Sequence, residues 1–183
     1  MPMVKVIVVG SGGREHTIAW KLAQSSSIDE VICVPGNGGT ATEKKCRNIS
    51  LSQGSYVEIA KKEGCSFAVI GPEDPLAEGL ADSFWEAGIP CVGPKSKGAQ
   101  LEASKDLAKD FMAKYNVACP ASKTFENETD AHNYIDQHGA PIVIKADGLA
   151  AGKGVVVAAT LSEAHKAVTE LMADGRVGEA GKK

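Results

Sequence analysis

Short apolar runs alternate with segments of helical character along the first hundred residues. The apolar runs predict four buried strands, over residues 4–9, 31–34, 67–70 and 90–94. The segments between them predict helices, over residues 14–23, 55–64 and 74–88. Strands that are separated by helices are typical of a parallel sheet with right-handed crossovers. We therefore predict an α/β fold whose N-terminal domain is built on a Rossmann-like parallel sheet.

Capping residues mark the ends of two of these helices. Ser55 and Glu58 match a capping box, and Gly64 suits the end of the same helix. Asp74 is the expected N-cap of the next helix, with Pro75 at its first position and an end at residue 88.

The pattern changes near residue 100, so we predict a first domain over residues 1–103 and a second over residues 104–183. In the second domain the spacing predicts three helices and two strands, over residues 104–115, 129–137, 162–173, 141–144 and 155–159. A capping box of Thr160 and Glu163 opens the last helix, and a glycine-rich loop joins the two strands. About 80 residues are few for a nucleotide-binding module that encloses its ligand between two lobes. We therefore expect the second domain to be incomplete.

Composition excludes several classes of protein. Hydrophobic residues make up 43% of the chain and charged residues 23%, which excludes global disorder. The net charge of -3, without a long basic run, argues against nucleic acid as a partner. We expect no membrane span, because no apolar run approaches roughly 20 residues, and we see no signal-peptide pattern. Five scattered cysteines favour reduced thiols in a cytoplasmic protein over a metal site or disulfide bonds.

Each predicted strand of the first domain ends in a loop rich in glycine, asparagine or acidic residues. The carboxyl ends of parallel strands meet at one edge of a sheet, where ligands bind. We therefore predict one cleft at this edge, lined by residues 10–16, 35–40, 71–75 and 93–94.

The loop after the first strand, with the sequence GSGGREH, opens a helix and suits an anion at the helix N-terminus. It is not a dinucleotide fingerprint, because the third glycine of that motif falls on Glu15. We predict that this loop binds the phosphate of a small ligand through Gly10, Gly12, Gly13, Arg14 and His16. The alternative is a tight turn needed only for packing, with Arg14 in solvent and His16 in a structural role.

Three more residues of these loops are candidates for binding the same small ligand. Asn37 lies in the loop after the second strand, and Glu73 and Asp74 follow the third strand. A carboxylate at this position can accept hydrogen bonds from sugar hydroxyls. Asp74 can equally be no more than the helix cap.

Lysines and glycines of the second domain indicate a polyphosphate ligand, with ATP as the leading candidate. Lys145 ends an otherwise apolar strand, where a charge is costly without a partner. Lys105 stands at a helix start, against the helix dipole, and Lys153 lies inside the glycine-rich loop. The loop glycines that can let backbone N–H groups approach an anion are Gly148, Gly152 and Gly154. A solvated Lys105 and a mobile surface Lys153 are the alternatives, and the spacing does not match a Walker P-loop.

Five segments occur in one order and together resemble a known family. They are residues 10–16 (GSGGREH), 35–41 (PGNGGTA), 71–76 (GPEDPL), 100–105 (QLEASK) and 145–155 (KADGLAAGKGV). Over essentially all 183 residues the chain resembles the glycinamide ribonucleotide synthetases, the phosphoribosylamine–glycine ligases of the ATP-grasp superfamily. Gly38 departs from the alanine that is usual in this family, with little expected effect. The larger departure is length, because the family continues well beyond this point.

The resemblance implies a pre-ATP-grasp domain that binds 5-phosphoribosylamine, followed by the first part of an ATP-grasp module. It implies a ligase of de novo purine biosynthesis that joins glycine to 5-phosphoribosylamine through glycyl phosphate, while ATP becomes ADP and phosphate. Lys105 and Lys145 would hold the α- and β-phosphates, and the loop around Lys153 would close over the γ-phosphate. Residues 10–16 and Glu73 would position the sugar phosphate, and no side chain here would act as a catalytic nucleophile.

The resemblance also implies what this chain lacks. The ligands of Mg²⁺ or Mn²⁺, the grip on adenine and most of the glycine site are expected beyond residue 183, in the rest of the ligase chain. We therefore expect the chain to be inactive alone. Two alternatives are a non-catalytic fragment that binds nucleotide or sugar phosphate, and another ATP-grasp purine enzyme such as a carboxylase. The loops at residues 35–40 and 71–76 count against the carboxylase.

Overall fold

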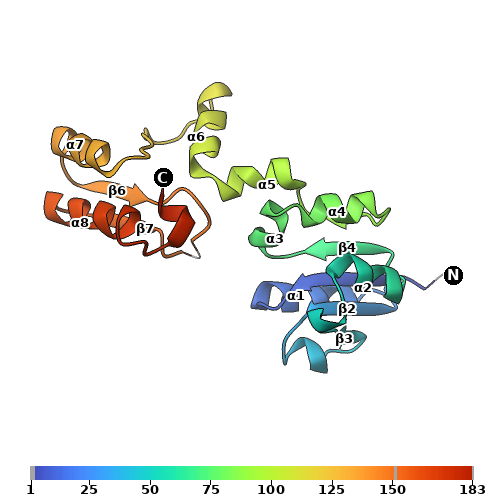
Figure 1. Ribbon diagram of the computed structural model, residues 1–183. Coiled ribbons are helices and arrows are strands. Elements are labelled where there is room, and N and C mark those ends of the chain that lie inside the picture. Colours follow the sequence, from blue (N-terminus) through green and yellow to red (C-terminus); the bar gives the residue numbers. More distant parts are fainter. Residues whose placement is uncertain (1–2, 151, 183) are drawn as a thin grey trace. The chain divides into compact units, whose positions relative to one another are not determined.

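The computed structural model describes residues 3–150 and 152–182 of the chain. The chain divides into two compact units, Met1–Ala99 and Gln100–Lys183. Figure 1 shows the elements of each unit. The helix α5 (Ser96–Ala103) contains the point at which the chain passes from the first unit to the second. Within the described ranges, no helix combines the length and the apolar content that crossing a membrane requires.

A five-stranded parallel sheet forms the centre of the first unit, in the order β3-β2-β1-β4-β5. Its strands are β1 (Lys5–Gly10), β2 (Glu30–Pro35), β3 (Cys46–Asn48), β4 (Phe67–Ile70) and β5 (Cys91–Val92). The helices of the unit are α1 (Gly13–Ala23), α2 (Tyr56–Glu63), α3 (Glu73–Ala77) and α4 (Leu80–Glu86), with 3₁₀ turns at η1 (Thr40–Thr42) and η2 (Leu51–Gln53). The predicted α/β fold with a Rossmann-like parallel sheet is confirmed.

The central strands are buried on both faces of this sheet. Ile7 and Val9 of β1 pack in one apolar cluster with Phe84 of α4. Val6 and Val8 point to the opposite face and pack in a second cluster with Ala19 of α1. A strand that is covered on both faces has no room for polar side chains along its length. Polar chemistry is therefore confined to the loops at the strand ends.

The structure corrects the prediction at the helix that was expected over residues 74–88. Two helices occupy this stretch, because Gly79 takes a left-handed conformation (φ 90°) between α3 and α4. Asp74 is not an N-cap, since Pro72 precedes the first turn of α3 and Asp74 lies within that turn. The short strand β3 and the helix α5 were not predicted. The capping box of Ser55 and Glu58 is confirmed at the start of α2.

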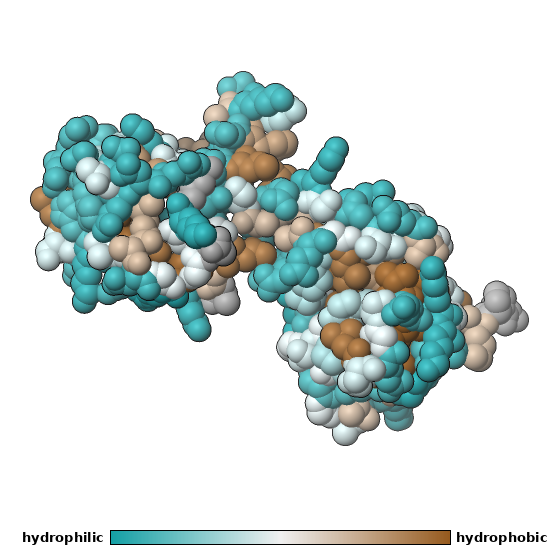
Figure 2. Space-filling view, viewed as in Figure 1, coloured by the Kyte–Doolittle hydropathy of each residue, from teal (hydrophilic) through white to brown (hydrophobic). Residues whose placement is uncertain are grey.

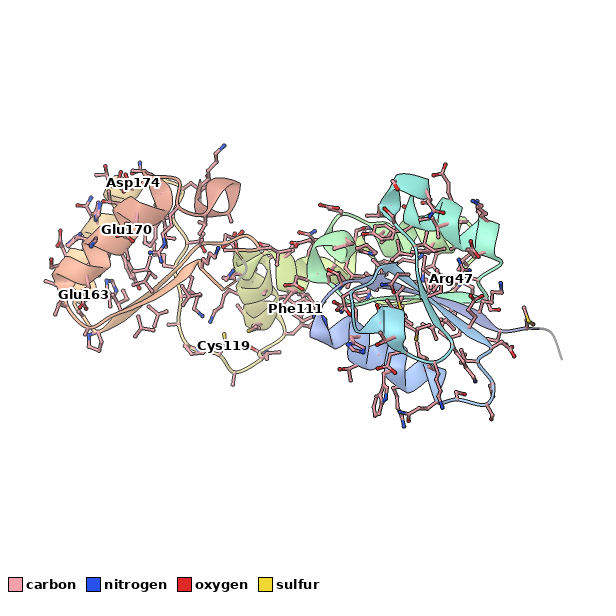
Figure 3. All side chains as sticks on the ribbon, turned by 90° about the horizontal axis from the view of Figure 1, so that it is seen from below. Arg47, Phe111, Cys119, Glu163, Glu170 and Asp174 are labelled. Atoms are coloured by element: carbon pink, nitrogen blue, oxygen red, sulfur yellow. The ribbon has the colours of Figure 1, made fainter. Side chains whose placement is uncertain are left out.

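The second unit contains two antiparallel strands and three α-helices in its described part. The helices are α6 (Lys105–Lys114), α7 (Glu128–His138) and α8 (Leu161–Met172), the strands are β6 (Ile142–Lys145) and β7 (Val155–Ala158), and a 3₁₀ turn η3 (Gly178–Lys182) follows. Glu163, labelled in Figure 3, completes the predicted capping box with Thr160 at the start of α8. The strand that was predicted to end at Lys145 is confirmed as β6.

The two faces of the β6–β7 pair have different surroundings. One face carries Ile142 and Ile144 and packs with Ala131 and Ile135 of α7 and Val168 of α8. The other face carries three exposed valines and one lysine, which are Val143, Lys145, Val155 and Val157. The strands therefore offer an open apolar surface that ends in a cation.

The visible surface is mainly hydrophilic, with apolar residues in separate patches (Figure 2). The exposed large apolar side chains of the first unit include Trp20, Trp85 and Val92. Apolar side chains that are exposed singly are normal in soluble proteins. We therefore do not interpret these three residues as a binding surface.

Replacing Phe84 with alanine is expected to lower the free energy of unfolding of the first unit by about 3–5 kcal/mol. The reason is that the Phe84 side chain is fully buried, at 0% exposure, against the central sheet. Trp85→Ala is the matched control, since the neighbouring side chain is 45% exposed; it is expected to cost no more than about 1 kcal/mol. Urea denaturation followed by circular dichroism measures both, and equal losses would contradict the packing.

Candidate functional site

The loops after β1, β2 and β4 meet at the carboxyl edge of the first sheet, as the strand order predicts. The backbone N–H of Gly36 donates to the Gly10 carbonyl at 3.2 Å, and that of Gly71 donates to the Val9 carbonyl at 3.2 Å. The side-chain amide of Asn37 donates to the Ser11 carbonyl at 2.9 Å. The loop after β2 is thus tied to the glycine-rich loop that opens α1, and the loop after β4 is tied to the end of β1.

A buried carboxylate, that of Glu15, lies at the centre of these loops. The Glu15 side chain accepts hydrogen bonds from the Gly12 backbone N–H at 2.8 Å and from the Arg14 Nε–H at 2.7 Å. Its residue is 4% exposed. Sequence reasoning did not select Glu15 as a site residue. The sequence did contain a feature that could have pointed to Glu15. Glu15 stands where the dinucleotide motif has its third glycine.

Arg14 and Glu73, both predicted site residues, are brought together at this edge. The Arg14 Nη2 donates to the Glu73 carboxylate at 3.3 Å, and both side chains are about half exposed. The hydrogen bond to Glu15, followed by the one to Glu73, raises the pKa of Arg14. A hydrogen bond from its own backbone N–H, and then the one from Arg14, lowers the pKa of the Glu73 carboxyl from its ordinary 4.5. The site therefore carries a fully charged guanidinium and a fully charged carboxylate near neutral pH.

The other predicted residues of the first unit shape the loops. Asn37 uses its side-chain oxygen to accept from the N–H groups of Gly39 and Thr40, at 2.8 and 2.9 Å. His16 contacts the Glu43 carboxylate at 3.0 Å through Nε2, and Gly39 leaves room for the His16 ring. A Cβ on Gly10 or Gly12 would meet the Glu15 side chain, whereas Gly13 faces open space. Asp74 lies in the first turn of α3.

In the second unit, a hydrogen-bonded junction joins the start of α6 to the turn after β6. The Asp147 carboxylate accepts from the Asp106 backbone N–H at 2.7 Å and from the Ser104 hydroxyl at 3.0 Å. The Lys105 ammonium donates to the backbone carbonyls of Asp147 and Gly148, at 3.2 and 3.0 Å. The junction fixes Lys105 beside the turn that follows Lys145. Sequence reasoning selected Lys105, and it missed Asp147.

A cavity of about 580 Å³ lies in the second unit, and both Lys105 and Lys145 line it. Its other walls come from α6, the segment 120–125, α7, β6 and α8. The structure therefore brings two of the three predicted lysines to one cavity. Among the described residues that line it, Lys153 does not appear.

The glycines of the loop between β6 and β7 meet three different local requirements. Gly152 has a positive φ of 78°, which favours glycine. A Cβ on Gly154 would lie 3.1 Å from the Ala146 Cβ, and one on Gly148 would lie 2.8 Å from the Ala180 Cβ. Loop packing thus accounts for a small residue at Gly148 and Gly154, and backbone conformation accounts for glycine at position 152. Ala151 of this loop lies outside the described residues.

Two family models together match nearly the whole chain. The first, "Phosphoribosylglycinamide synthetase, N domain", matches residues 4–102. The second, "Phosphoribosylglycinamide synthetase, ATP-grasp (A) domain", matches residues 103–183. The chain belongs to the phosphoribosylglycinamide synthetase family. The two matched ranges meet within α5, the helix in which the chain passes between its compact units.

Individual relatives agree with the phosphoribosylglycinamide synthetase family. The chain is 54% identical to a phosphoribosylamine–glycine ligase of Neisseria meningitidis serogroup B over 179 residues, which are 97% of this chain and 42% of that protein. The crystal structure of phosphoribosylamine–glycine ligase from Thermotoga maritima has a TM-score of 0.74 and 30% identity, over 96% of this chain and 41% of that one. The chain thus spans less than half the length of these relatives.

A more distant structure shares the fold alone. The biotin carboxylase domain of Hydrogenobacter thermophilus 2-oxoglutarate carboxylase, solved with MgADP, has a TM-score of 0.71 at 19% identity, over 98% of this chain and 43% of that one. The architecture of the two matched domains therefore extends beyond the phosphoribosylglycinamide synthetase family.

Replacing Arg14 with alanine is expected to move the pKa of the Glu73 carboxyl up toward 4.5, because one of the groups that stabilise its charged form is lost. In the unchanged protein, a lowered pKa means that the Arg14–Glu73 contact is present above pH 4.5 and is lost as the pH falls through the lowered value. A ¹³C NMR titration of the carboxyl groups measures this shift.

Glu58 is the control carboxyl in the same titration. Its pKa is lowered by the Ser55 backbone N–H, and this cause is independent of Arg14. An unchanged Glu73 titration in the Arg14→Ala variant, or an equal shift at Glu58, would contradict the pairing.

Proposed function

We propose that this chain is the N-terminal portion of a phosphoribosylamine–glycine ligase of de novo purine biosynthesis. That enzyme joins glycine to 5-phosphoribosylamine while ATP becomes ADP and phosphate, with glycyl phosphate as the activated form of glycine. Membership of the family in both units supports the proposal. The observation that carries it is the meeting of Lys105 and Lys145 at one cavity, next to the glycine-rich loop.

The cavity of the second unit suits the phosphates of ATP. Its volume of about 580 Å³ falls within the roughly 300–1,000 Å³ that is usual for small-molecule sites. Two ammonium groups in its lining can neutralise phosphate oxygens, and charge-assisted hydrogen bonds of this kind are among the strong ones. Gly148, Gly152, Lys153 and Gly154 complete the proposed nucleotide site, with the loop covering the phosphate that is transferred.

The carboxyl edge of the first unit is the proposed site for 5-phosphoribosylamine. The start of α1 would receive the phosphate, because backbone N–H groups at a helix N-terminus favour an anion. The Gly12 N–H already donates to Glu15, so Gly13, which faces open space, would supply the contact, while Gly10 and Gly12 leave room for Glu15. Arg14 adds a cation, and Glu73 can accept from ribose hydroxyls while it holds Arg14. Asn37 and His16 support the loop that borders the site, and Asp74 stands one residue beyond Glu73.

In this proposal the side chains bind, orient and neutralise substrates, and no side chain forms a covalent bond. ATP supplies the phosphoryl group that activates the glycine carboxylate. Reactions of this type gain most from placement and from electrostatic stabilisation of the phosphates. The described residues bring no three metal-ligating side chains together, so we assign no step to a metal here. We propose that the ligands of Mg²⁺ or Mn²⁺ and the glycine site lie in the longer sequence that the relatives carry.

A cytoplasmic location is part of the same proposal. All five cysteines are free thiols, which fits a reducing compartment. Burial raises the pKa of the Cys65 thiol to about 11, which keeps it protonated. Cys119, labelled in Figure 3, is exposed and is paired with no other cysteine.

The chain alone is expected to release no ADP from ATP, glycine, 5-phosphoribosylamine and Mg²⁺, because it spans less than half of its relatives' length. A coupled ADP assay measures this. A polypeptide extended to the full length of the relatives, assayed in parallel, is expected to turn over. Clear turnover by the 183 residues alone would show that the site is complete within them.

Replacing Lys145 with alanine is expected to weaken the binding of MgADP to the chain by about ten- to a hundredfold, since one charge-assisted contact with phosphate is worth roughly 1.5–3 kcal/mol. Lys166→Ala is the matched control, because its side chain on α8 is 76% exposed and lies outside the cavity lining. Isothermal titration calorimetry measures both affinities. Equal affinity in all three proteins would remove Lys145 from the nucleotide site.

A further inference from the structure

The Glu15 carboxylate uses its two oxygens for two different tasks. Oε2 accepts from the Gly12 backbone N–H at 2.8 Å, which caps the start of α1. Oε1 accepts from the Arg14 Nε–H at 2.7 Å. Helix capping alone needs only the first of these contacts. The second contact fixes the guanidinium of a side chain that is otherwise 57% exposed.

Glycines at the carboxyl ends of two neighbouring strands make room for this carboxylate. A Cβ on Gly10, at the end of β1, would lie 2.5 Å from the Glu15 Cγ. A Cβ on Gly71, after β4, would overlap the Glu15 carboxylate. Gly71 has no positive φ that would by itself require glycine. The loops after two neighbouring strands are therefore shaped around Glu15, and they leave its carboxylate little freedom to move.

We propose that Glu15 is a positioning residue for the sugar-phosphate site, and that it acts through Arg14. This inference rests on the proposed function of the first unit. Contacts with Glu15 and Glu73 use two of the five guanidinium N–H donors. The remaining donors are then held in a fixed plane at the carboxyl edge, available to the oxygens of a phosphate.

Fixing Arg14 before the ligand arrives favours binding in two ways. An exposed arginine loses conformational entropy when it binds, and a side chain that is already held loses less. A planar guanidinium also matches the geometry of a phosphate only when its orientation is correct. Glu15 itself stays 4% exposed behind Arg14, so its own charge does not face the ligand directly.

A double-mutant cycle tests whether Glu15 acts through Arg14. The binding of ribose 5-phosphate to the 183-residue chain is measured by calorimetry for the unchanged protein, Glu15→Gln, Arg14→Ala and the double variant. Ribose without phosphate is the ligand control, and circular dichroism at the titration temperature shows that each variant is folded. Glutamine keeps the length of the side chain, but it offers one acceptor oxygen in place of two.

Each single variant is expected to weaken ribose 5-phosphate binding by about tenfold. The double variant is expected to bind no more weakly than Arg14→Ala, because Glu15 has nothing left to position. An equal loss from Glu15→Gln with and without Arg14, or no loss at all, would overturn the inference and leave Glu15 as a helix cap. No binding by the unchanged protein would refute the proposed function of the first unit, and the inference with it.

A second variant avoids any change at the buried carboxylate. Arg14→Lys keeps the positive charge at an exposed position but removes the planar group that spans Glu15 and Glu73. We expect its affinity for ribose 5-phosphate to fall by a factor similar to that of Arg14→Ala. Affinity equal to that of the unchanged protein would show that orientation is irrelevant, and would overturn the inference even if Glu15→Gln did not fold.

Discussion

Burial of the central parallel strands on both faces is the constraint on which the first unit depends. With β1 and β2 enclosed by two apolar clusters, a charged side chain along their length would be desolvated without a partner. Charged and polar groups gather instead where the strands end. Glu15 is a buried charged residue, and its burial is tolerated because its carboxylate accepts two hydrogen bonds, from the Gly12 backbone N–H and from Arg14. The proposed substrate site therefore lies at the carboxyl ends of the strands, where charged groups are not enclosed by the apolar core.

Patterns that act over a few residues made much of this fold predictable. The apolar run over residues 4–9 matches β1 closely, and the capping boxes at Ser55 and Thr160 are confirmed. The three residues of β3 include Arg47 and Asn48, so the sequence contains no apolar run that would predict this strand. The expected cap at Asp74 was wrong because Pro75 is also tolerated later in the first turn, where its missing N–H costs nothing. The break at Gly79 depends on a backbone conformation that many helical glycines do not adopt.

In the candidate site, too, residues could be predicted from their immediate sequence neighbours, whereas their partners from distant parts of the sequence could not. Arg14, Glu73, Lys105 and Lys145 could be selected because each stands at a strand end or a helix start. Their partners could not, since Asp147 meets the start of α6 across about 40 residues of sequence. Glu15 was adjacent to a selected residue, but nothing in its sequence context showed that the chain at Gly71, directly after another strand, is shaped around it. Three lysines were expected at one place, and the cavity lining in the described residues includes two of them.

The junction around Lys105 has a mechanical consequence. An ammonium group has three N–H donors, and the backbone carbonyls of Asp147 and Gly148 take two of them. A third hydrogen is left for an anion in the cavity, so the nitrogen can hold the turn and the anion at once. Such an anion would bind the Lys105 Nζ, the same atom that holds the start of the glycine-rich loop through the Asp147 and Gly148 carbonyls. By thermodynamic reciprocity, whatever stiffens that loop would also tighten the hold on the anion.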